Sequence, residues 1–362
     1  MNKRVLLAMS GGVDSSLAAV LLQNEGYEVI GLTLKVWSYE KTYFGKKGTV
    51  SDEQYIFDAQ ALAQRLGIEH HVADIQDQFY DAVITPFMAE YMAGRTPNPC
   101  VQCNPTMKWG TFVHYADQFD CEYVATGHYV KKVEEKGRFY LVQGKDQVKD
   151  QSYVLWQLTQ EQLRRTLFPL GGYNKNEVKQ MAQESGIEFP TSQGESYDIC
   201  FIPDGDYRSF LFLHCQDRCE KLRGGVICDS KGKWLGKHRG YPFYTIGQRK
   251  GLQVAVGHPV YVTHIDAENN RVVLGEKEEL LSKKIALSNI NIQKYDQLPD
   301  SYRALVRIRY KDKGAMAQIY QEGTQYFCEF DVPISAATPG QSAVFYEGEQ
   351  LVGGAIIEYA IQ

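Results

Sequence analysis

The sequence predicts an α/β protein that has a parallel-sheet unit, a small central β domain and a C-terminal β-barrel. Two features of the 362-residue chain indicate this class. In the first half, short apolar runs alternate with segments of helical periodicity, as in a parallel sheet with helices on both faces. After Asp204, short β-type runs separated by turn residues replace this pattern, which suggests small barrels. The length itself favours two or three folding units.

The first half divides into strands and helices by its apolar pattern. The runs RVLLAM and EVIGLTL are predicted to be buried strands, and the helix between them stops at Gly26. The same alternation continues to about residue 126. The predicted strands are 4–9, 28–34, 69–73 and 123–126, and the predicted helices are 14–26, 55–66, 77–92 and 108–119.

The second half reads as β structure. From Tyr241 onward the runs VYVTHI, RVVLG, ALVRIRY, AMAQIY and QYFCEF are separated by Gly, Asn and Pro turns. We therefore expect three domains, at 1–203, 204–280 and 281–362. The segment KTYFGKKGT, residues 41–49, is expected to be a mobile loop.

The N-terminus and composition predict a cytoplasmic protein without a membrane anchor. The first apolar run breaks at Gly11, too early for a signal peptide. No stretch approaches the ~20 apolar residues that span a bilayer. In the cytoplasm the eight cysteines are expected to be reduced, so a cysteine pair is more often chemical than structural.

Positive charge is concentrated in two segments, although the formal net charge is −5. Eight Lys and Arg residues occur with one acid between Lys221 and Lys250, and five occur with one acid between Arg303 and Lys313. Such segments can steer a polyanion to one face of a protein. The alternative is ordinary solvated side chains on loops and strand edges.

The stretch AMSGGVDSS, residues 8–16, joins the first predicted strand to the first predicted helix. At the carboxyl edge of a parallel sheet, such a junction binds ligands. Gly11 and Gly12 let the backbone approach an anion, and free amides at the helix start favour phosphate. The loop lacks the Gly-Lys-Ser/Thr ending of a Walker loop. The alternative is a tight turn in which Asp14 is a helix-start carboxylate.

Motifs along nearly the whole chain carry a family resemblance. SGGVDSS resembles the pyrophosphate loop of the N-type ATP pyrophosphatases (the PP-loop superfamily), which adenylate their substrates. Seven later motifs occur in the order found in the tRNA-specific 2-thiouridylases, the MnmA family. They are GRTPNPCVQCN, ATGHY, KDQSY, FPLG, ICFIPDGDYRSFL, YTIGQRKGL and TPGQSAVFYEGE.

The resemblance implies a PP-loop ATP pyrophosphatase domain and a tRNA-uridine 2-sulfurtransferase activity. ATP would adenylate the C2 oxygen of the wobble uridine, position 34, because oxide alone is a poor leaving group. Sulfur would then replace it, giving 2-thiouridine, AMP and pyrophosphate. Mg²⁺ would balance the pyrophosphate charge, with Asp14 as a candidate partner. The implied ATP-binding residues are Ala8, Met9, Ser10, Gly11, Gly12, Val13, Asp14, Ser15, Leu34 and Gly127.

The resemblance also implies two catalytic cysteines. Cys200, in the ICFI motif, would carry a persulfide received from a sulfur-donor protein, a cysteine desulfurase or a sulfur relay protein. Cys103 would release the sulfur by forming a disulfide bond with Cys200. The alternative for both is a small buried thiol.

Cys100 departs from the family, whose better-known members have Asp at this position. Cys100, Cys103 and Cys200 could together hold a [4Fe–4S] cluster with one open iron position, which is an alternative source of sulfur. A zinc site is less favoured, because Cys215 and Cys219 have i,i+4 spacing on a predicted helix and read as buried thiols.

Transfer of the motifs residue by residue implies an RNA-binding surface. A flipped target base is expected. His128 could be a general base, an RNA contact or a loop-end histidine bonded to backbone. Residues expected to border the target base are Asn98, Pro99 and Cys100, and those expected to contact tRNA are His128, Lys149, Asp150, Gln151, Arg309, Tyr310 and Gln341.

Two other functions are weighed against this one. A PP-loop synthetase acting on a small molecule would leave the basic β segments and both cysteines without a role. A non-catalytic tRNA-binding protein would leave the glycine loop without a role.

Overall fold

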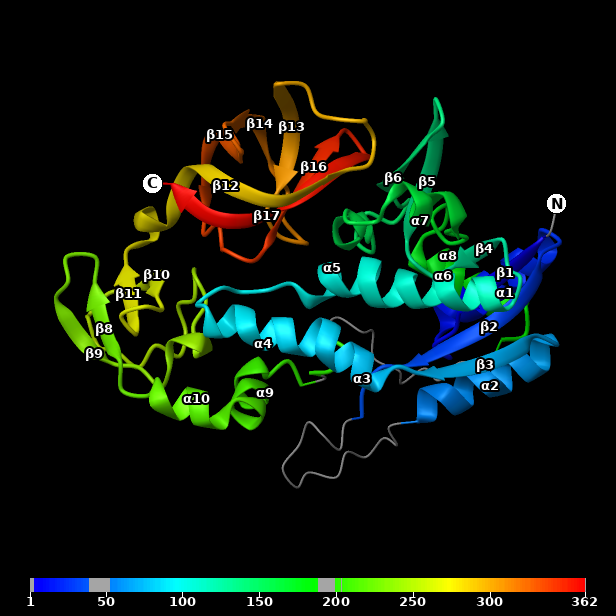
Figure 1. Ribbon diagram of the computed structural model, residues 1–362, viewed down its shortest axis with the longest axis horizontal. Coiled ribbons are helices and arrows are strands. Elements are labelled where there is room, and N and C mark those ends of the chain that lie inside the picture. Colours follow the sequence, from blue (N-terminus) through cyan, green and yellow to red (C-terminus); the bar gives the residue numbers. More distant parts are fainter. Residues whose placement is uncertain (1–2, 39–52, 188–198, 203, 362) are drawn as a thin grey trace.

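The computed structural model describes residues 3–38, 53–187, 199–202 and 204–361 (Figure 1). The loop expected at 41–49 lies outside the described residues. No helix in the described part of the chain is long and apolar enough to cross a membrane.

The first unit is built on a five-stranded parallel sheet, as predicted. Its strand order is β3-β2-β1-β4-β7, and every neighbouring pair is parallel. The strands are β1 (Arg4–Ala8), β2 (Glu28–Lys35), β3 (Glu69–Asp74), β4 (Tyr123–Ala125) and β7 (Thr166–Leu167). The bounds of β1 to β4 agree with the four predicted strands to within two residues, and β7 was not predicted.

Helices cover both faces of this sheet because successive residues of β1 point to opposite sides. Val5 and Leu7 belong to one buried cluster with α1 (Val13–Asn24), α2 (Gln54–Leu66) and α8 (Lys175–Glu184). Leu6 belongs to another, with α4 (Thr85–Met92), α6 (Trp109–Gln118) and α9 (Tyr207–His214). The two apolar faces predicted from the sequence are therefore both buried.

Two predicted helices contain π-helical turns. The helix expected at 77–92 consists of α3 (Gln76–Phe79), the π turn η2 (Tyr80–Ile84) and α4. The helix expected at 108–119 begins earlier, with α5 (Pro99–Cys103) and the π turn η3 (Asn104–Lys108) before α6. Pro86 and Pro105 lack the amide that would continue the α-helical hydrogen bonding, which explains the wider turns beside them.

The chain then crosses to a small central sheet. After α7 (Gln160–Arg165) and α8, helices α9 and α10 (Gln216–Lys221) pack into the core of the first unit through Phe210 and Leu211. The central sheet has the order β10-β11-β8-β9 and is open, not a barrel. Its strands are β8 (Val226–Asp229), β9 (Trp234–Lys237), β10 (Tyr261–Asp266) and β11 (Arg271–Gly275). Short 3₁₀ turns occur at three places in the described chain: η4 (Ser152–Leu155), η5 (Tyr241–Phe243) and η6 (Lys277–Leu280).

The C-terminal strands form the predicted barrel, drawn in yellow to red in Figure 1. Its order is β12-β15-β14-β13-β16-β17, and pairing of β12 with β17 closes it. The strands are β12 (Leu281–Ile292), β13 (Ser301–Arg307), β14 (Ala315–Glu322), β15 (Gln325–Ser335), β16 (Ser342–Glu347) and β17 (Gln350–Ile361). A hairpin of the first unit, β5 (Val130–Glu135) and β6 (Arg138–Gln143), extends the barrel sheet through the pairing of Val142 with Gln350.

Candidate functional site

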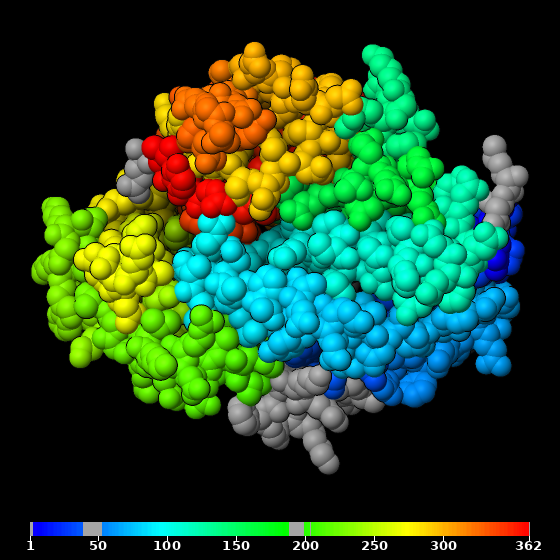
Figure 2. Space-filling model, viewed as in Figure 1, coloured from blue at the N-terminus to red at the C-terminus, as the bar shows by residue number. Residues whose placement is uncertain are grey.

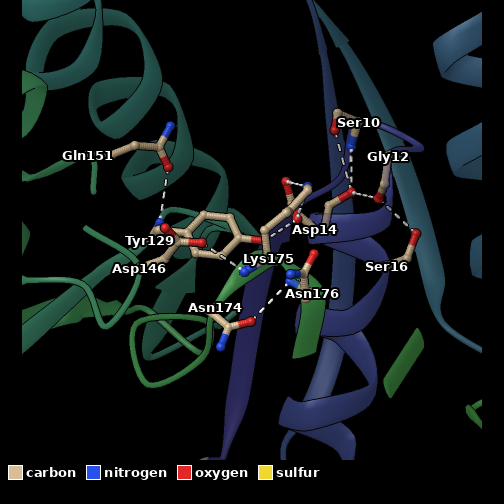
Figure 3. Close-up of polar contacts among 11 residues, drawn as sticks. Ser10, Gly12, Asp14, Ser16, Tyr129, Asp146, Gln151, Asn174, Lys175 and Asn176 are labelled. Carbon is tan, nitrogen blue, oxygen red and sulfur yellow. Dashed lines mark hydrogen bonds and ion pairs between the residues drawn. The ribbon is translucent and has the colours of Figure 1, made fainter. Parts of the chain in front are cut away.

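The glycine loop lies between β1 and α1, at the carboxyl edge of the parallel sheet (Figure 3). Gly11 has φ 71°, and a Cβ there would lie 2.6 Å from Asp58 Cβ, so this position requires glycine. Gly12 is the N-cap of α1, and no side chain caps the first amides. The hydroxyls of Ser15 and Ser16 both donate to the Gly12 carbonyl oxygen, at 3.0 and 2.9 Å. The loop is thus held in place by its own hydroxyls while its helix-start amides are left for an anion.

Asp14 is the acidic side chain of this loop, and two residues from distant segments bind it. Lys175 Nζ lies 2.7 Å from both carboxylate oxygens, and the Tyr129 hydroxyl donates to one of them at 2.6 Å (Figure 3). The side chains of Lys175 and Asp14 are 15% and 35% exposed. A cation and a carboxylate therefore meet at the mouth of the anion-binding loop.

Lys175 was missed by the sequence analysis. It begins α8, whose N-cap Asn174 forms a capping box with Glu177. A lysine in the first turn opposes the helix dipole, which favours acidic residues there. Asn-Lys-Asn-Glu before an apolar run is a helix-start pattern, so the sequence could show where α8 begins but not that Lys175 faces Asp14. A cation kept at this unfavourable position, facing Asp14, indicates a functional contact.

Two further strand ends bring predicted nucleotide-binding residues to the loop. A Cβ at Gly127 would lie 3.2 Å from the Asp14 carbonyl carbon and 3.3 Å from the Ser15 amide nitrogen, so the ATGHY backbone lies against the start of α1. Leu34 lies near the end of β2, and its carbonyl oxygen accepts a hydrogen bond from Tyr55 of α2. Residues 8–15, Leu34 and Gly127 therefore share one edge of the sheet.

The three predicted functional cysteines lie within electrostatic reach of one another. Cys100 and Cys103 are on α5, and Cys200 is in the turn closed by the Ile202 amide and the Ile199 carbonyl oxygen. Burial is the main cause that raises the pKa of Cys103 to about 11, and the Cys100 thiol contributes to this rise. Part of the Cys200 residue is exposed to solvent, but many protein atoms surround its thiol. Loss of hydration is therefore the largest cause that raises the pKa of Cys200 to about 12, and the Cys103 and Cys100 thiols contribute to the rise.

Lys108 is a second functional candidate that the sequence analysis missed. It ends the π turn η3, five residues after Cys103, and a π-helical turn places such residues on one face of the helix. Its positive charge lowers the pKa values of Cys100, Cys103 and Cys200, in opposition to burial. Lys108 is the cation that all three thiols share.

None of the eight cysteines, all of which are in the described segments, forms a disulfide bond. The predicted Cys103–Cys200 disulfide is therefore not supported. No three His, Cys, Asp or Glu side chains within residues 3–38, 53–187, 199–202 and 204–361 are arranged to hold a metal ion, so Cys100, Cys103 and Cys200 do not fit a metal site as they stand. We derive no step through a cluster.

Cys215 and Cys219 are both buried, as expected. They do not share one helix: Cys215 is the residue between α9 and α10, and Cys219 is inside α10. The Cys215 thiol contacts Met88 Sδ at 3.5 Å. Both are packing residues.

His128 lies beside the cysteine-bearing helix. Its Nδ1 is 2.8 Å from the Thr126 hydroxyl, and its ring packs against Trp109 and Phe168. Burial, with the Lys108 charge, lowers the pKa of His128 to about 3. The imidazole is therefore neutral near pH 7 and offers a hydrogen-bonding group and not a positive charge.

Several residues expected to contact tRNA are bonded within the protein. Asp150 is buried, and its carboxylate accepts hydrogen bonds from the Gly144 amide and from the amide and hydroxyl of Ser152. The Gln151 side chain accepts from the Tyr129 amide at 3.0 Å (Figure 3). Tyr310 donates to the Asp150 carbonyl oxygen at 2.9 Å, across the junction of barrel and first unit.

The loop that leads to α5 is also fastened to the barrel. Gln341 donates to the Thr96 carbonyl oxygen at 2.8 Å, and the Thr96 amide donates to the Pro339 carbonyl oxygen at 2.9 Å. Arg95 reaches Glu358 of β17 with Nη1 at 2.9 Å. Figure 2 shows the same junction, where red barrel atoms lie against cyan atoms of the first unit. Asn98, Pro99 and Cys100 follow directly after this attachment.

Arg309 remains exposed on the barrel, where its Nη2 donates to the Ser335 and Ala336 carbonyl oxygens at 2.6 and 2.9 Å. Lys149 is half-buried next to Asp150. Arg309 precedes Tyr310 on the barrel and Lys149 precedes Asp150 on the first unit, so the Tyr310–Asp150 hydrogen bond places both cationic residues near the junction.

Three family models match successive parts of the chain. They are described as a tRNA methyl transferase HUP domain (residues 3–204), a tRNA methyl transferase PRC-barrel domain (212–276) and an aminomethyltransferase beta-barrel domain (282–357).

Curated relatives align over almost the full length. A protein of Phocaeicola vulgatus named tRNA-specific 2-thiouridylase MnmA 3 is 46% identical over 98% of this chain and 94% of its own. Proteins named tRNA-specific 2-thiouridylase MnmA from Salinibacter ruber and Clostridium acetobutylicum are 47% and 42% identical, over 97% and 99% of this chain and 93% and 100% of theirs. Among solved structures, the U34-tRNA thiolase NcsA of Methanococcus maripaludis with its [4Fe–4S] cluster aligns at TM-score 0.34 and 19% identity, over 61% of this chain and 67% of that one.

Proposed function

The chain belongs to the family of tRNA-specific 2-thiouridylases, MnmA, and from that membership we propose that it replaces the C2 oxygen of the wobble uridine of tRNA with sulfur, using ATP. One observation within the chain supports this most directly. An anion-binding glycine loop and three neighbouring cysteines, on different segments, occur in one α/β unit to which a β-barrel is fastened.

In the first step, ATP binds along residues 8–15 with the adenosine near Leu34 and Gly127. The helix-start amides and the loop favour the phosphates, and Lys175 supplies the positive charge that this lysine-free loop lacks. The uridine C2 oxygen attacks the α-phosphate, which forms an adenylated uridine and releases pyrophosphate. The C2 oxygen can then leave as part of AMP, whereas oxide alone is a poor leaving group.

Mg²⁺, when bound, would neutralise charge on the pyrophosphate oxygens. Asp14 has the hard oxygen ligands that this ion prefers, but both oxygens already contact Lys175. Asp14 can hold the ion only after Lys175 moves from the carboxylate to a phosphate. We propose this exchange of partners as the first response of the site to ATP.

In the second step, the outer sulfur of a Cys200 persulfide attacks C2 and displaces AMP. The Cys103 thiolate then attacks Cys200 Sγ, which forms a Cys103–Cys200 disulfide and leaves the sulfur on the uridine. Cellular thiols must reduce this disulfide before another turnover. A persulfide suits Cys200, because its own thiol, with a pKa of about 12, is protonated at neutral pH and a persulfide is more acidic.

Lys108 supports both sulfur anions in this scheme. Burial disfavours the anionic forms of Cys103 and Cys200, and the Lys108 charge opposes that effect. We propose that Lys108 stabilises the persulfide during attack and the Cys103 thiolate during release.

The RNA would lie across the junction of barrel and first unit, in the cytoplasm. Asn98, Pro99 and Cys100 would border the flipped base, with neutral His128 as a hydrogen-bonding group nearby. Lys149, Asp150, Gln151, Arg309, Tyr310 and Gln341 surround the junction, and for the bonded ones among them the contact would be made by backbone or by rearranged side chains.

The test is ATP cleavage and thiolation by the full-length protein. Release of AMP and pyrophosphate should require unmodified tRNA, and metal-free protein carrying a Cys200 persulfide should thiolate tRNA in a single turnover. Thiolation that appears only with stoichiometric iron and sulfide would support the cluster alternative instead. ATP cleavage with a small-molecule acceptor and no tRNA would support a synthetase.

A further inference from the structure

A hollow is lined in part by the turn that carries Cys200, and by no residue of the glycine loop. Its volume is about 880 Å³, and its walls come from α9, α10 and residues 239–253 of the central domain. Its lining is mainly apolar and includes Ile202, Phe210, Phe212, Phe243 and Tyr244. This size suits a segment with several side chains. None of the residues assigned to ATP or tRNA lines it.

The hollow reaches the turn that carries Cys200. Ile202 lines the hollow, and its amide donates to the Ile199 carbonyl oxygen at 2.8 Å, which closes the turn around Cys200. The side chain of Ile202 is buried, whereas that of Cys200 is exposed. A molecule seated in the hollow would therefore contact the turn that carries Cys200.

The rim carries a small excess of positive charge, because four cationic side chains and three carboxylates line the hollow. Arg223, Arg239 and Lys250 are exposed lining residues, and among the described residues their cationic groups have no hydrogen-bond or ion-pair partner. The three carboxylates keep their charge, but each accepts a hydrogen bond within the protein. Asp204 accepts from the Asp206 amide, Asp206 from the Ser209 amide and Glu220 from the Gln216 side chain.

We propose that this hollow docks the protein that supplies sulfur to Cys200, through a segment with apolar side chains flanked by carboxylates. The proposal rests on the proposed function, because it assumes that Cys200 receives a persulfide. An apolar floor with a cationic rim matches such a segment, whereas an RNA backbone would leave the floor uncovered.

The transfer itself balances without an added oxidant. As the Cys200 thiol gives up its proton, its sulfur attacks the outer sulfur of the donor's persulfide, a Cys200–sulfur bond forms, and the donor's sulfur–sulfur bond breaks. The donor cysteine leaves as a thiolate, and the Cys200 proton passes to solvent or to that thiolate.

The test compares two sulfur sources with the same full-length variants. The docking variants are Phe212→Asp and Arg223→Glu, which change exposed lining residues. The matched controls are Trp234→Asp and Lys231→Glu, exposed residues of the same domain that do not line the hollow. One source is a purified cysteine desulfurase with L-cysteine, and the other is glutathione persulfide, which needs no docking.

With the desulfurase, each docking variant should thiolate tRNA about 10-fold more slowly than the wild type, as expected when a central side chain of an interface is removed. With glutathione persulfide, both should match the wild type, and tRNA affinity should be unchanged. The controls should match the wild type with both sources.

Equal slowing with both sources would overturn the proposal, and so would wild-type rates with both. Weaker tRNA binding by the docking variants would identify the hollow as an RNA site. A wild-type protein that never takes sulfur from the desulfurase would also overturn docking. In contrast, a wild type that cannot thiolate with glutathione persulfide would contradict the proposed function itself.

Discussion

Replacing Lys175 with Met should impair ATP use far more than stability. The proposal transfers the Lys175 ammonium from Asp14 to a phosphate, so Lys175→Met removes one charge-assisted hydrogen bond from the ATP complex. Such a bond contributes about 1.5–3 kcal/mol. The expected loss in kcat/KM for ATP is therefore about 10-fold to about 150-fold.

The effect on folding should be smaller. The Asp14 side chain is about a third exposed, at 35%, and retains the Tyr129 hydroxyl after the substitution. Partly exposed pairs contribute only about 1 kcal/mol to stability, so the free energy of unfolding should fall by no more than that.

The assay is tRNA-dependent release of pyrophosphate, measured beside thermal unfolding and tRNA affinity. Lys175→Arg keeps the charge and should retain much of the activity. Lys179→Met, an exposed position one turn further along α8, is the matched control and should match the wild type. Wild-type ATP kinetics in Lys175→Met would show that Lys175 only neutralises Asp14, and the proposed exchange of partners would be wrong.

Three further substitutions test the sulfur step, and two more test the junction and the RNA surface. Cys103→Ser should abolish multiple-turnover thiolation, whereas Cys100→Asp, the commoner family residue, should keep substantial activity; loss of activity in both, with iron in anaerobic protein, would favour a cluster. Lys108→Met should slow single-turnover thiolation most near pH 7 and less as the pH rises toward the raised pKa of Cys103, about 11. Burial opposes ionisation of Glu358, but hydrogen bonds from Ser288 and Arg95 outweigh burial and lower the pKa of Glu358. The wild type should therefore be more stable than Glu358→Gln above the ordinary pKa of ~4.3. This difference in stability should disappear as the pH falls through the lower pKa of the folded state. An advantage that persists in acid would contradict that ion pair. Lys313→Glu should make the slope of log affinity for tRNA against log salt concentration shallower by about one, because one cation is removed from the phosphate backbone, and an unchanged slope would remove Lys313 from the RNA surface.

The sequence was sufficient for features set by local patterns. Alternating apolar runs predicted β1, β2 and the two covered faces, and Gly11 predicted a loop that no other residue allows, as its positive φ confirms. The π turns were missed because helical periodicity does not show where a proline removes a backbone donor. The central region was expected only to be a small β domain, and its open strand order could not be read from the sequence, since short strands look alike whether or not their edges pair.

Contacts between distant segments could not be predicted in this way. The pairing of Asp14 with Lys175 joins residues from opposite ends of the first unit, and each reads separately as an ordinary helix-start residue. The same is true of Lys108 and Cys200, which only the fold brings together. The periodicity of apolar residues describes one helix or strand at a time, so it does not show which charged side chains from different elements lie together.

The contacts that attach the barrel to the first unit also hold the segment that leads to the cysteines. Thr96 is held from both sides, through its amide by Pro339 and through its carbonyl by Gln341, and Cys100 follows four residues later. A Cβ at Gly340 would lie only 2.9 Å from the Thr96 carbonyl oxygen, so this close approach of the two loops requires glycine. The barrel loop is thus joined directly to the segment that leads to Cys100 and Cys103. Under the proposed function, RNA bound to the barrel would be positioned relative to Cys103 by the same contacts that hold the two domains together.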